Sequence, residues 1–459
     1  METPQLKKKY GLFTAIAMVV GVVAGSGVFF KAEVVLTATN GNVQTGVLAW
    51  LLVGLVMVIC ANAFAVLASR YERANGVVDF AEAEVGSTFS FFMGWFMATL
   101  YYPSLNAILA WVTSHYLCIL FGIPNETGSM TMLFAAFFLV SLFGINSLAP
   151  MLAGKLQVST TVIKLIPLCC MAIFGTLSGV KSGMLARNFF IGAPLESGSG
   201  LFAAAIAVAF AYEGWIVAIS LSGEIRDSKR NMPIALTIGS LIIVGIYVLY
   251  YIGLTGTVTT DTLMTSGHKA ASLAFEKIFG SGWGTGVFVL VVISCIATCN
   301  GVSAANCRGL YALTSRKYVS SRFAELDPHS NTPLSSAIMG LMMSMLWLIH
   351  FYGSNIVTPW FPKAFCFDVS ELPVVTLYAF YIPIFLQMMR REKDMSAPRR
   401  FILPICAILG CVFMVVACAI THKEKMLGYF SVFAVDMLLG AFVMLRNKKA
   451  KPQRIPFDP

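Results

Sequence analysis

Hydrophobic runs follow one another along almost the whole chain, separated by short polar segments. A run of about 20 apolar residues is long enough to cross the hydrocarbon core of a bilayer as an α-helix. The pattern predicts such helices at residues 12–30, 46–69, 88–119, 129–147, 156–180, 201–222, 233–257, 284–314, 334–352, 366–389, 401–420 and 427–445. We therefore expect an all-α, polytopic membrane protein with 12 transmembrane helices.

The first run contains a stretch that does not suit a continuous helix. Three glycines and a serine lie within Gly21 to Gly27, and glycine costs about 1 kcal/mol per position in a helix. Backbone groups freed at membrane depth must line a cavity and find partners there. The N–H groups of the following half-helix would favour an anion such as a carboxylate. A small-residue seam for close helix packing is the alternative interpretation.

The sixth run, residues 201–222, carries Glu213 beside Gly214. An acidic residue inside a span usually marks a functional site facing a cavity, and the glycine offers a place to unwind. Discontinuous helices at matching positions of two five-helix halves predict a transporter with inverted repeats and a midplane binding site. The alternative is that Glu213 lies at a helix end near water.

Lys164 is a second charge within a predicted span, the run 156–180. It lies about eight residues from the start of the run, too deep for easy snorkelling. We expect its ammonium to bind carbonyls of the interrupted first helix and a hydroxyl of the eighth, for which Ser294 and Thr298 are candidates. It would act as a fixed internal cation or as a proton-titrating coupling group, unless it lies nearer the interface.

The composition supports membrane insertion, since 58% of residues are hydrophobic and only 12% are charged, against roughly 25% in soluble domains. The net charge of +10 comes from short basic clusters between the runs. Most of these clusters fall on the side of the N-terminus, which predicts a multi-pass protein of the cell inner (plasma) membrane with both termini cytoplasmic. Basic residues interleaved with aromatics, typical of nucleic-acid binding, do not occur.

The remaining reactive residue types indicate no enzyme and no cofactor. The eleven cysteines lie almost wholly inside the runs and resemble small buried hydrophobes. The five histidines are scattered and form no metal-ligand motif. The charged segment from Arg70 to Gly86 is expected to be a short cytoplasmic piece with a solvated face, and Asp368 and Glu371 to lie at the interface.

Several short motifs add up to a family resemblance. They are Gly25-Ser26-Gly27-Val28-Phe29, Leu156-Gln157, Ile163-Lys164-Leu165-Ile166-Pro167, Phe210-Ala211-Tyr212-Glu213-Gly214-Trp215, Gly223-Glu224, Asn231-Met232-Pro233, Asn300-Gly301, Arg308, Asp327-Pro328-His329 and Thr332-Pro333. With these motifs the chain resembles the L-type amino acid transporter family of the amino acid–polyamine–organocation superfamily, and within it the bacterial serine/threonine exchangers.

The resemblance implies a fold of the LeuT type and sodium-independent, obligatory exchange. The repeats would be residues 12–180 and 201–390, followed by two extra helices at 401–445. A cytoplasmic N-terminus, 1–11, and a basic cytoplasmic tail, 446–459, would flank them.

The resemblance also implies roles for single residues. Backbone N–H groups around Ser26 and Gly27 would hold the substrate carboxylate. Carbonyls of Val23, Phe210 and, as a further candidate, Glu213 would receive the α-ammonium, with Ala211 in the same site. Phe210 would gate the external side, and Lys164 would stand where sodium-coupled relatives bind an ion.

The expected substrate is a small or medium neutral L-amino acid. Glu213 occupies a position that is glycine, serine or aspartate in relatives, so cationic amino acids or polyamines are the alternative. A proton-coupled carrier and a non-transporting sensor also stay open. No covalent heavy-chain subunit is expected, because Cys118 falls within the end of the third helix.

Overall fold

The computed structural model describes residues 11–71, 76–124, 127–190, 199–219, 225–314, 318–357 and 359–447. The motif Gly223-Glu224, nearly all of the N-terminal segment 1–11 and most of the basic tail 446–459 lie outside these ranges.

Ten helices in the described ranges are long and apolar enough to cross a membrane. They are built from α3 (Val43–Arg70), α5 (Ser87–Phe96) with α6 (Tyr102–Leu120), α7 (Ser129–Leu148), α8 (Pro150–Cys170) with α9 (Thr176–Ser182), α13 (Ser228–Thr255), α14 (Thr260–Ser266) with α15 (Ala270–Cys307) and α16 (Gly309–Thr314), α17 (Leu334–Phe351), α18 (Leu372–Arg391), α19 (Leu403–Thr421) and α20 (Lys423–Asn447). Two shorter apolar stretches, Leu12–Gly21 and Gly200–Ala211, fall in the two runs expected to be interrupted. The all-α, polytopic expectation is confirmed.

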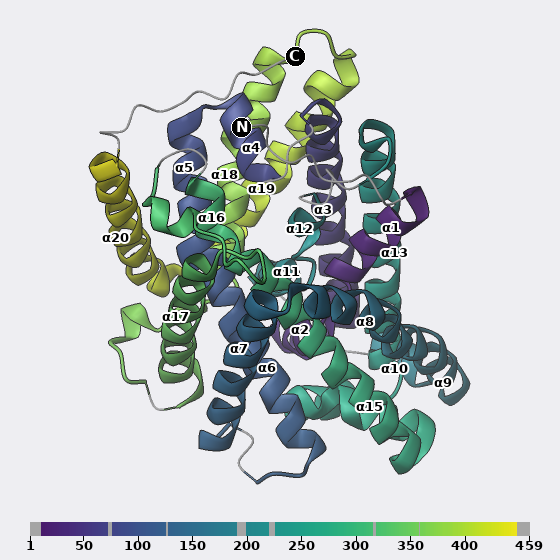
Figure 1. The fold of residues 1–459 in the computed structure, drawn as a ribbon. Coiled ribbons are helices and arrows are strands. Elements are labelled where there is room, and N and C mark those ends of the chain that lie inside the picture. Colours follow the sequence, from purple (N-terminus) through teal and green to yellow (C-terminus); the bar gives the residue numbers. More distant parts are fainter. Residues whose placement is uncertain are drawn as a thin grey trace.

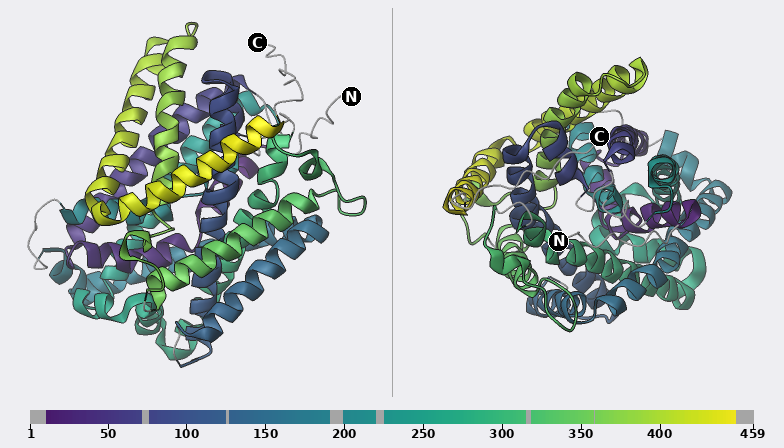
Figure 2. Two further views of the ribbon diagram at one scale, coloured as in Figure 1. Left: turned by 90° about the vertical axis from the view of Figure 1, so that its left-hand side faces the viewer. Right: turned by 45° about the horizontal axis from the view of Figure 1, so that its top comes forward.

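Two segments, α2 (Gly27–Ala38) and α11 (Ser199–Ala211), lie at the centre of the bundle. In Figure 1 these two segments are surrounded by the longer helices, whereas α20 lies at the left edge. In the left view of Figure 2, α20 (yellow) crosses the front of the bundle, on its outer surface. The burial of the chain agrees, because every residue from Ala204 to Ala211 is at most 5% exposed. A charged or polar group placed at these central helices is therefore shielded from lipid.

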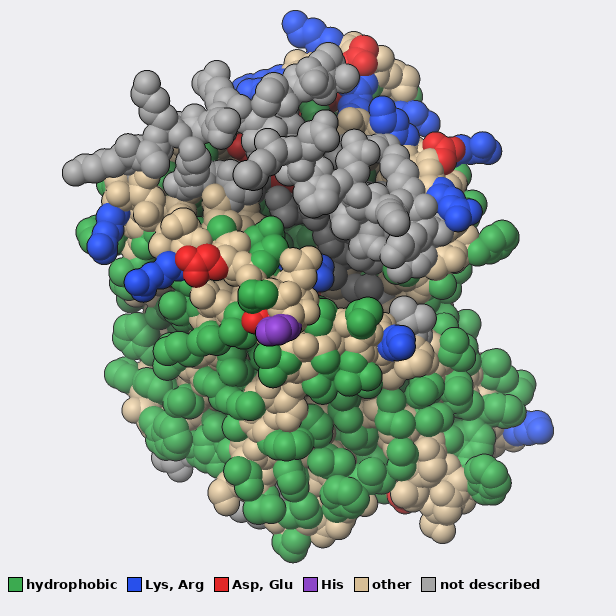
Figure 3. Space-filling view, viewed as in Figure 1, with side chains coloured by type: hydrophobic (Ala, Val, Ile, Leu, Met, Phe, Trp, Pro, Cys, Tyr) green, Lys and Arg blue, Asp and Glu red, His purple; other side chains and the backbone are tan. Residues whose placement is uncertain are grey.

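The outer surface is apolar over most of its height. Figure 3 shows hydrophobic side chains covering the lower part of one face, while Lys and Arg gather toward the upper end. On α20 the exposed large side chains include Leu427, Leu438 and Leu445. Such a surface suits contact with lipid along the spans and with water and headgroups at the end.

The charged segment after α3 is not solvated as expected. Its helix α4 (Val77–Glu84) buries both Asp79 and Glu84. The hydroxyl of Tyr71 lies 3.5 Å from Glu84 and donates to Glu392 at 2.9 Å. Burial and the neighbouring carboxylate of Glu392 raise the pKa of Glu84 to about 7. The expectation was wrong for these two residues because the end of α18 packs against α4.

Candidate functional site

The first helix is interrupted between α1 (Leu12–Val23) and α2. Ala24, which follows α1, is extended with φ −62° and ψ 97°. At the start of α2, the N–H of Phe30 donates to the carbonyl of Ser26 at 3.2 Å. The N–H groups of residues 27–29 precede that bond, and a helix supplies no internal acceptor for them. They form the positive end of the half-helix.

The sixth helix is interrupted between α11 and α12 (Trp215–Ile219). Gly214 has φ +111°, a conformation that favours glycine over any residue with a Cβ. The N–H of Glu213 donates a hydrogen bond to the carbonyl of Phe210 at 3.2 Å, which closes a tight turn. The last carbonyls of α11 therefore end at this turn and form the negative end of a helix.

The two interruptions touch each other. A Cβ added to Gly27 would lie 2.7 Å from the Cα of Ala211, so no side chain separates the two backbones. The positive start of α2 thus lies beside the negative end of α11. Such a pair of helix ends can hold a zwitterion, with its carboxylate on the N–H groups and its ammonium on the carbonyls.

Tyr247 of α13 bridges the first interruption, and the sequence analysis missed it. Its hydroxyl donates to the carbonyl of Val23 at 2.9 Å and accepts from the N–H of Gly25 at 3.3 Å. These are two of the backbone groups that the interruption frees. The only signal in the sequence is a polar aromatic residue within an apolar run, which does not reveal its partner.

Replacing Tyr247 with phenylalanine should destabilise the protein and slow transport. The carbonyl of Val23 would lose a buried hydrogen bond, at a cost of about 1–3 kcal/mol. The measurement is thermal unfolding of the purified protein, followed by size-exclusion chromatography. Tyr250→Phe is the matched control, because that hydroxyl has no hydrogen-bond partner among the described residues. Equal melting temperatures of the two variants would contradict the bridging role.

Lys164 lies where the interruption begins. It is fully buried on α8, and its Nζ donates to the carbonyl of Gly21 in α1 at 3.1 Å. Ser294 of α15 is also buried, but its hydroxyl has no partner in the part of the chain that the structure describes. The structure therefore joins Lys164 to the first helix and not to Ser294. The other candidate, Thr298, packs against Gly25. Its hydroxyl oxygen lies 2.6 Å from the position that a Cβ on Gly25 would occupy.

The remaining expected residues lie around the same two interruptions. Ser26 is buried, and its hydroxyl has no hydrogen-bond partner within the described ranges. The ring of Phe210 packs edge-on against Phe30, with centroids 6.0 Å apart. The carboxylate of Glu213 accepts a hydrogen bond from the hydroxyl of Tyr101. The site thus gathers a buried hydroxyl, an aromatic pair and one acidic side chain.

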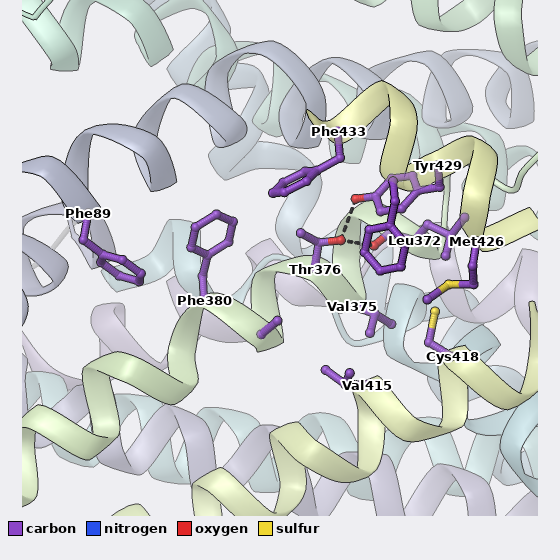
Figure 4. Close-up of a pocket in the computed structure, with 12 residues that line it drawn as sticks. Phe89, Leu372, Val375, Thr376, Phe380, Val415, Cys418, Met426, Tyr429 and Phe433 are labelled. Atoms are coloured by element: carbon purple, nitrogen blue, oxygen red, sulfur yellow. Dashed lines mark hydrogen bonds between the residues drawn. The ribbon is translucent and has the colours of Figure 1, made fainter. Parts of the chain in front are cut away.

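A separate apolar cavity of about 340 Å³ lies between α18, α19 and α20. Figure 4 shows its lining, in which Thr376 and Tyr429 hydrogen bond to each other and leave an almost entirely apolar wall. None of the expected substrate residues lines it. Across the described residues, no group of three or more His, Cys, Asp or Glu could hold a metal ion. The expected substrate residues therefore lie apart from this apolar cavity.

Comparison with known proteins agrees with this geometry. Residues 10–443 match the amino acid permease family. The serine/threonine exchanger SteT of Bacillus subtilis is 28% identical over 425 residues, which cover 91% of this chain and 92% of the relative. The human b(0,+)-type amino acid transporter 1 is 24% identical over 99% of this chain and 91% of its own length. The rabbit (Oryctolagus cuniculus) large neutral amino acids transporter small subunit 2 is 26% identical over 75% of this chain and 64% of its length.

These matches cover the central helices as well as the outer ones, and they bear out the resemblance to L-type transporters. Amino acid transport also accounts for two helix ends of opposite polarity side by side inside an apolar bundle. The chain belongs to the amino acid permease family and is a multi-pass amino acid transporter rather than an enzyme.

Proposed function

We propose that the protein is a sodium-independent exchanger of small or medium neutral L-amino acids, working by alternating access around the two interruptions. The observation that carries this proposal is the direct contact between Gly27 and Ala211, which sets the start of α2 beside the end of α11. N–H groups around Ser26 and Gly27 bind the carboxylate. Carbonyls of Val23, Phe210 and Glu213 receive the α-ammonium.

Sodium independence is supported by the position of Lys164. Its ammonium donates to a carbonyl at the end of α1, which is the kind of oxygen that would otherwise coordinate a metal cation. A fixed positive charge there leaves no need for a bound ion. The same group is the one that a proton-coupled carrier would titrate, so the two mechanisms differ only in whether Lys164 changes its charge.

The test is efflux of labelled L-serine from preloaded proteoliposomes, in buffers without sodium. An exchanger releases label only when unlabelled amino acid is present outside. Efflux into amino-acid-free buffer would overturn strict exchange, and a requirement for sodium would overturn sodium independence. Dependence on an imposed pH gradient would favour the proton-coupled alternative. Binding of the amino acid without any flux would favour a sensor.

Glu213 decides between neutral and cationic substrates. Its carboxylate already accepts a hydrogen bond from Tyr101, which supports an internal role and hence neutral substrates. Glu213→Gln should therefore leave the preference for L-serine over L-lysine within about threefold of the wild type, since threefold is below 1 kcal/mol. The measurement is competition by each amino acid for labelled uptake.

Glu424→Gln is the control for this variant, because Glu424 is exposed at the start of α20. If the wild type exchanges L-lysine and Glu213→Gln loses that activity more than tenfold, the cationic alternative holds instead.

We further propose that both termini are cytoplasmic and that the chain works without a covalently attached heavy chain. Cys118 at the end of α6 is buried, and its Sγ lies 3.4 Å from the hydroxyl of Thr131. This thiol is therefore unsuited to a disulfide with a partner.

A further inference from the structure

A buried ion pair links α2 to the outer helices. Nζ of Lys31 lies 2.7 Å from Oε1 of Glu371 and donates to the hydroxyl of Ser370 at 3.1 Å. The other carboxylate oxygen of Glu371 lies 3.0 Å from Nε2 of His422. The side chains of Lys31 and Glu371 are only 2% and 7% exposed. Removing either charge would leave the other buried without a partner, which destabilises a protein strongly.

The partners come from three different elements. Lys31 lies in α2, Glu371 is the residue before α18, and His422 follows the end of α19. The residues before Glu371 form a turn, in which the N–H of Ser370 donates to the carboxylate of Asp368 at 2.6 Å. Glu371 is buried by protein, and Lys31 of α2 is one of the groups that pack against its carboxylate. The carboxylate of Glu371 thus ties α2 to α18 and α19.

The ion pair also borders the aromatic cover of the proposed site. Nζ of Lys31 lies 5.1 Å from the ring centroid of Phe30 and 5.3 Å from that of Phe210. A cation at such distances is attracted to the ring faces. Phe210 belongs to the last turn of α11, next to the second interruption. Any movement of Lys31 away from Glu371 therefore disturbs the two rings as well.

We propose that Lys31 is a positioning residue for transport, and that its ion pair with Glu371 holds α2 and the Phe30–Phe210 pair closed over the external side of the site. This inference rests on the proposed function. The ammonium of Lys31 is directed at Glu371 and Ser370, so it acts through α2 and does not touch the substrate. Opening to the outside separates α2 from α18, and the pair breaks and re-forms in each cycle.

The inference predicts a specific change in kinetics. Variants Lys31→Met, Glu371→Gln and the double variant should favour the outward-open state. Counterflow of labelled L-serine in oriented proteoliposomes then gives half-saturation constants for each side. The ratio of the internal to the external constant should rise at least fivefold in all three variants. A loss of folded protein alone lowers the maximal rate and leaves this ratio unchanged.

The double variant keeps the test decisive because it leaves neither charge unpaired. It can therefore fold even where a single variant, with one unpaired buried charge, does not. Glu33→Gln is the matched control on α2, since that carboxylate accepts a hydrogen bond from Thr37 of the same helix at 3.0 Å. An unchanged ratio in the double variant would overturn the inference.

Hydrogen–deuterium exchange separates a failure of this inference from a failure of the proposed function. Amides of residues 27–38 should exchange at least fivefold faster in the double variant than in the wild type, whether or not the protein transports L-serine. If the wild type shows no counterflow but this difference is present, the proposed function fails and the closing contact stands. Equal exchange rates overturn the closing contact.

Discussion

Replacing Gly27 with alanine should reduce the maximal rate of amino acid exchange by about 10- to 100-fold. The added methyl group would lie 2.7 Å from the Cα of Ala211, which is backbone and cannot turn aside. Overpacking of this kind costs roughly 1–3 kcal/mol, and about 1.4 kcal/mol corresponds to a factor of ten in rate. The start of α2 and the end of α11 would move apart, although the substrate must contact both. The measurement is counterflow of labelled L-serine in proteoliposomes.

Gly245→Ala is the control for this prediction. Gly245 also lies in a span, in α13, but a Cβ there meets no atom within 4 Å. Its exchange rate should match the wild type. If Gly27→Ala exchanged serine as fast as Gly245→Ala, the contact between the two interruptions would not be part of the transport site.

Replacing Lys164 with methionine should lower the maximal exchange rate by about 10- to 100-fold with little loss of folded protein. The variant keeps the apolar stem but removes the donor that binds the carbonyl of Gly21. Hydrogen bonds from charged groups contribute roughly 1.5–3 kcal/mol. Because the charge itself is fully buried, its removal also relieves a desolvation cost, which offsets the loss in stability. Counterflow and thermal unfolding together measure both effects.

Lys155→Met is the matched control, since Lys155 lies on the same helix, α8, with its side chain exposed. It should behave like the wild type in both measurements. A Lys164→Met protein that exchanges amino acids at the rate of Lys155→Met would rule out a role for the buried ammonium in holding the first helix.

The sequence predicted the interruptions because their causes are local. Glycines in the first run weaken the helix wherever it lies, and Gly214 beside Glu213 does the same in the sixth. Lys164 lies so deep in its run that its ammonium needs a hydrogen-bond acceptor inside the protein. The carbonyl of Gly21 in the first helix is that acceptor. These inferences needed only helix geometry and the absence of water in the bilayer.

Pairings between distant residues could not be predicted in the same way. Lys31 and Glu371 are 340 positions apart. Lys31 directly follows the first apolar run and Glu371 lies near the start of the tenth, where a charge is ordinarily solvated. Tyr247 looks like any polar aromatic residue in a span until its hydroxyl is seen between Val23 and Gly25. Ser294 was predicted to bind Lys164 because it has a hydroxyl and lies in the eighth run. Neither property determines which way its side chain points on α15.

The central claim is that the start of α2 and the end of α11 bind one amino acid between them. The most direct test is a cryo-electron microscopy structure of the purified protein with the amino acid that it exchanges fastest. The account predicts ligand density between residues 25–28 and 208–214, with the carboxylate on the N–H groups around Ser26 and Gly27. Ligand bound elsewhere, or a first helix that is continuous through residues 24–26, would contradict it.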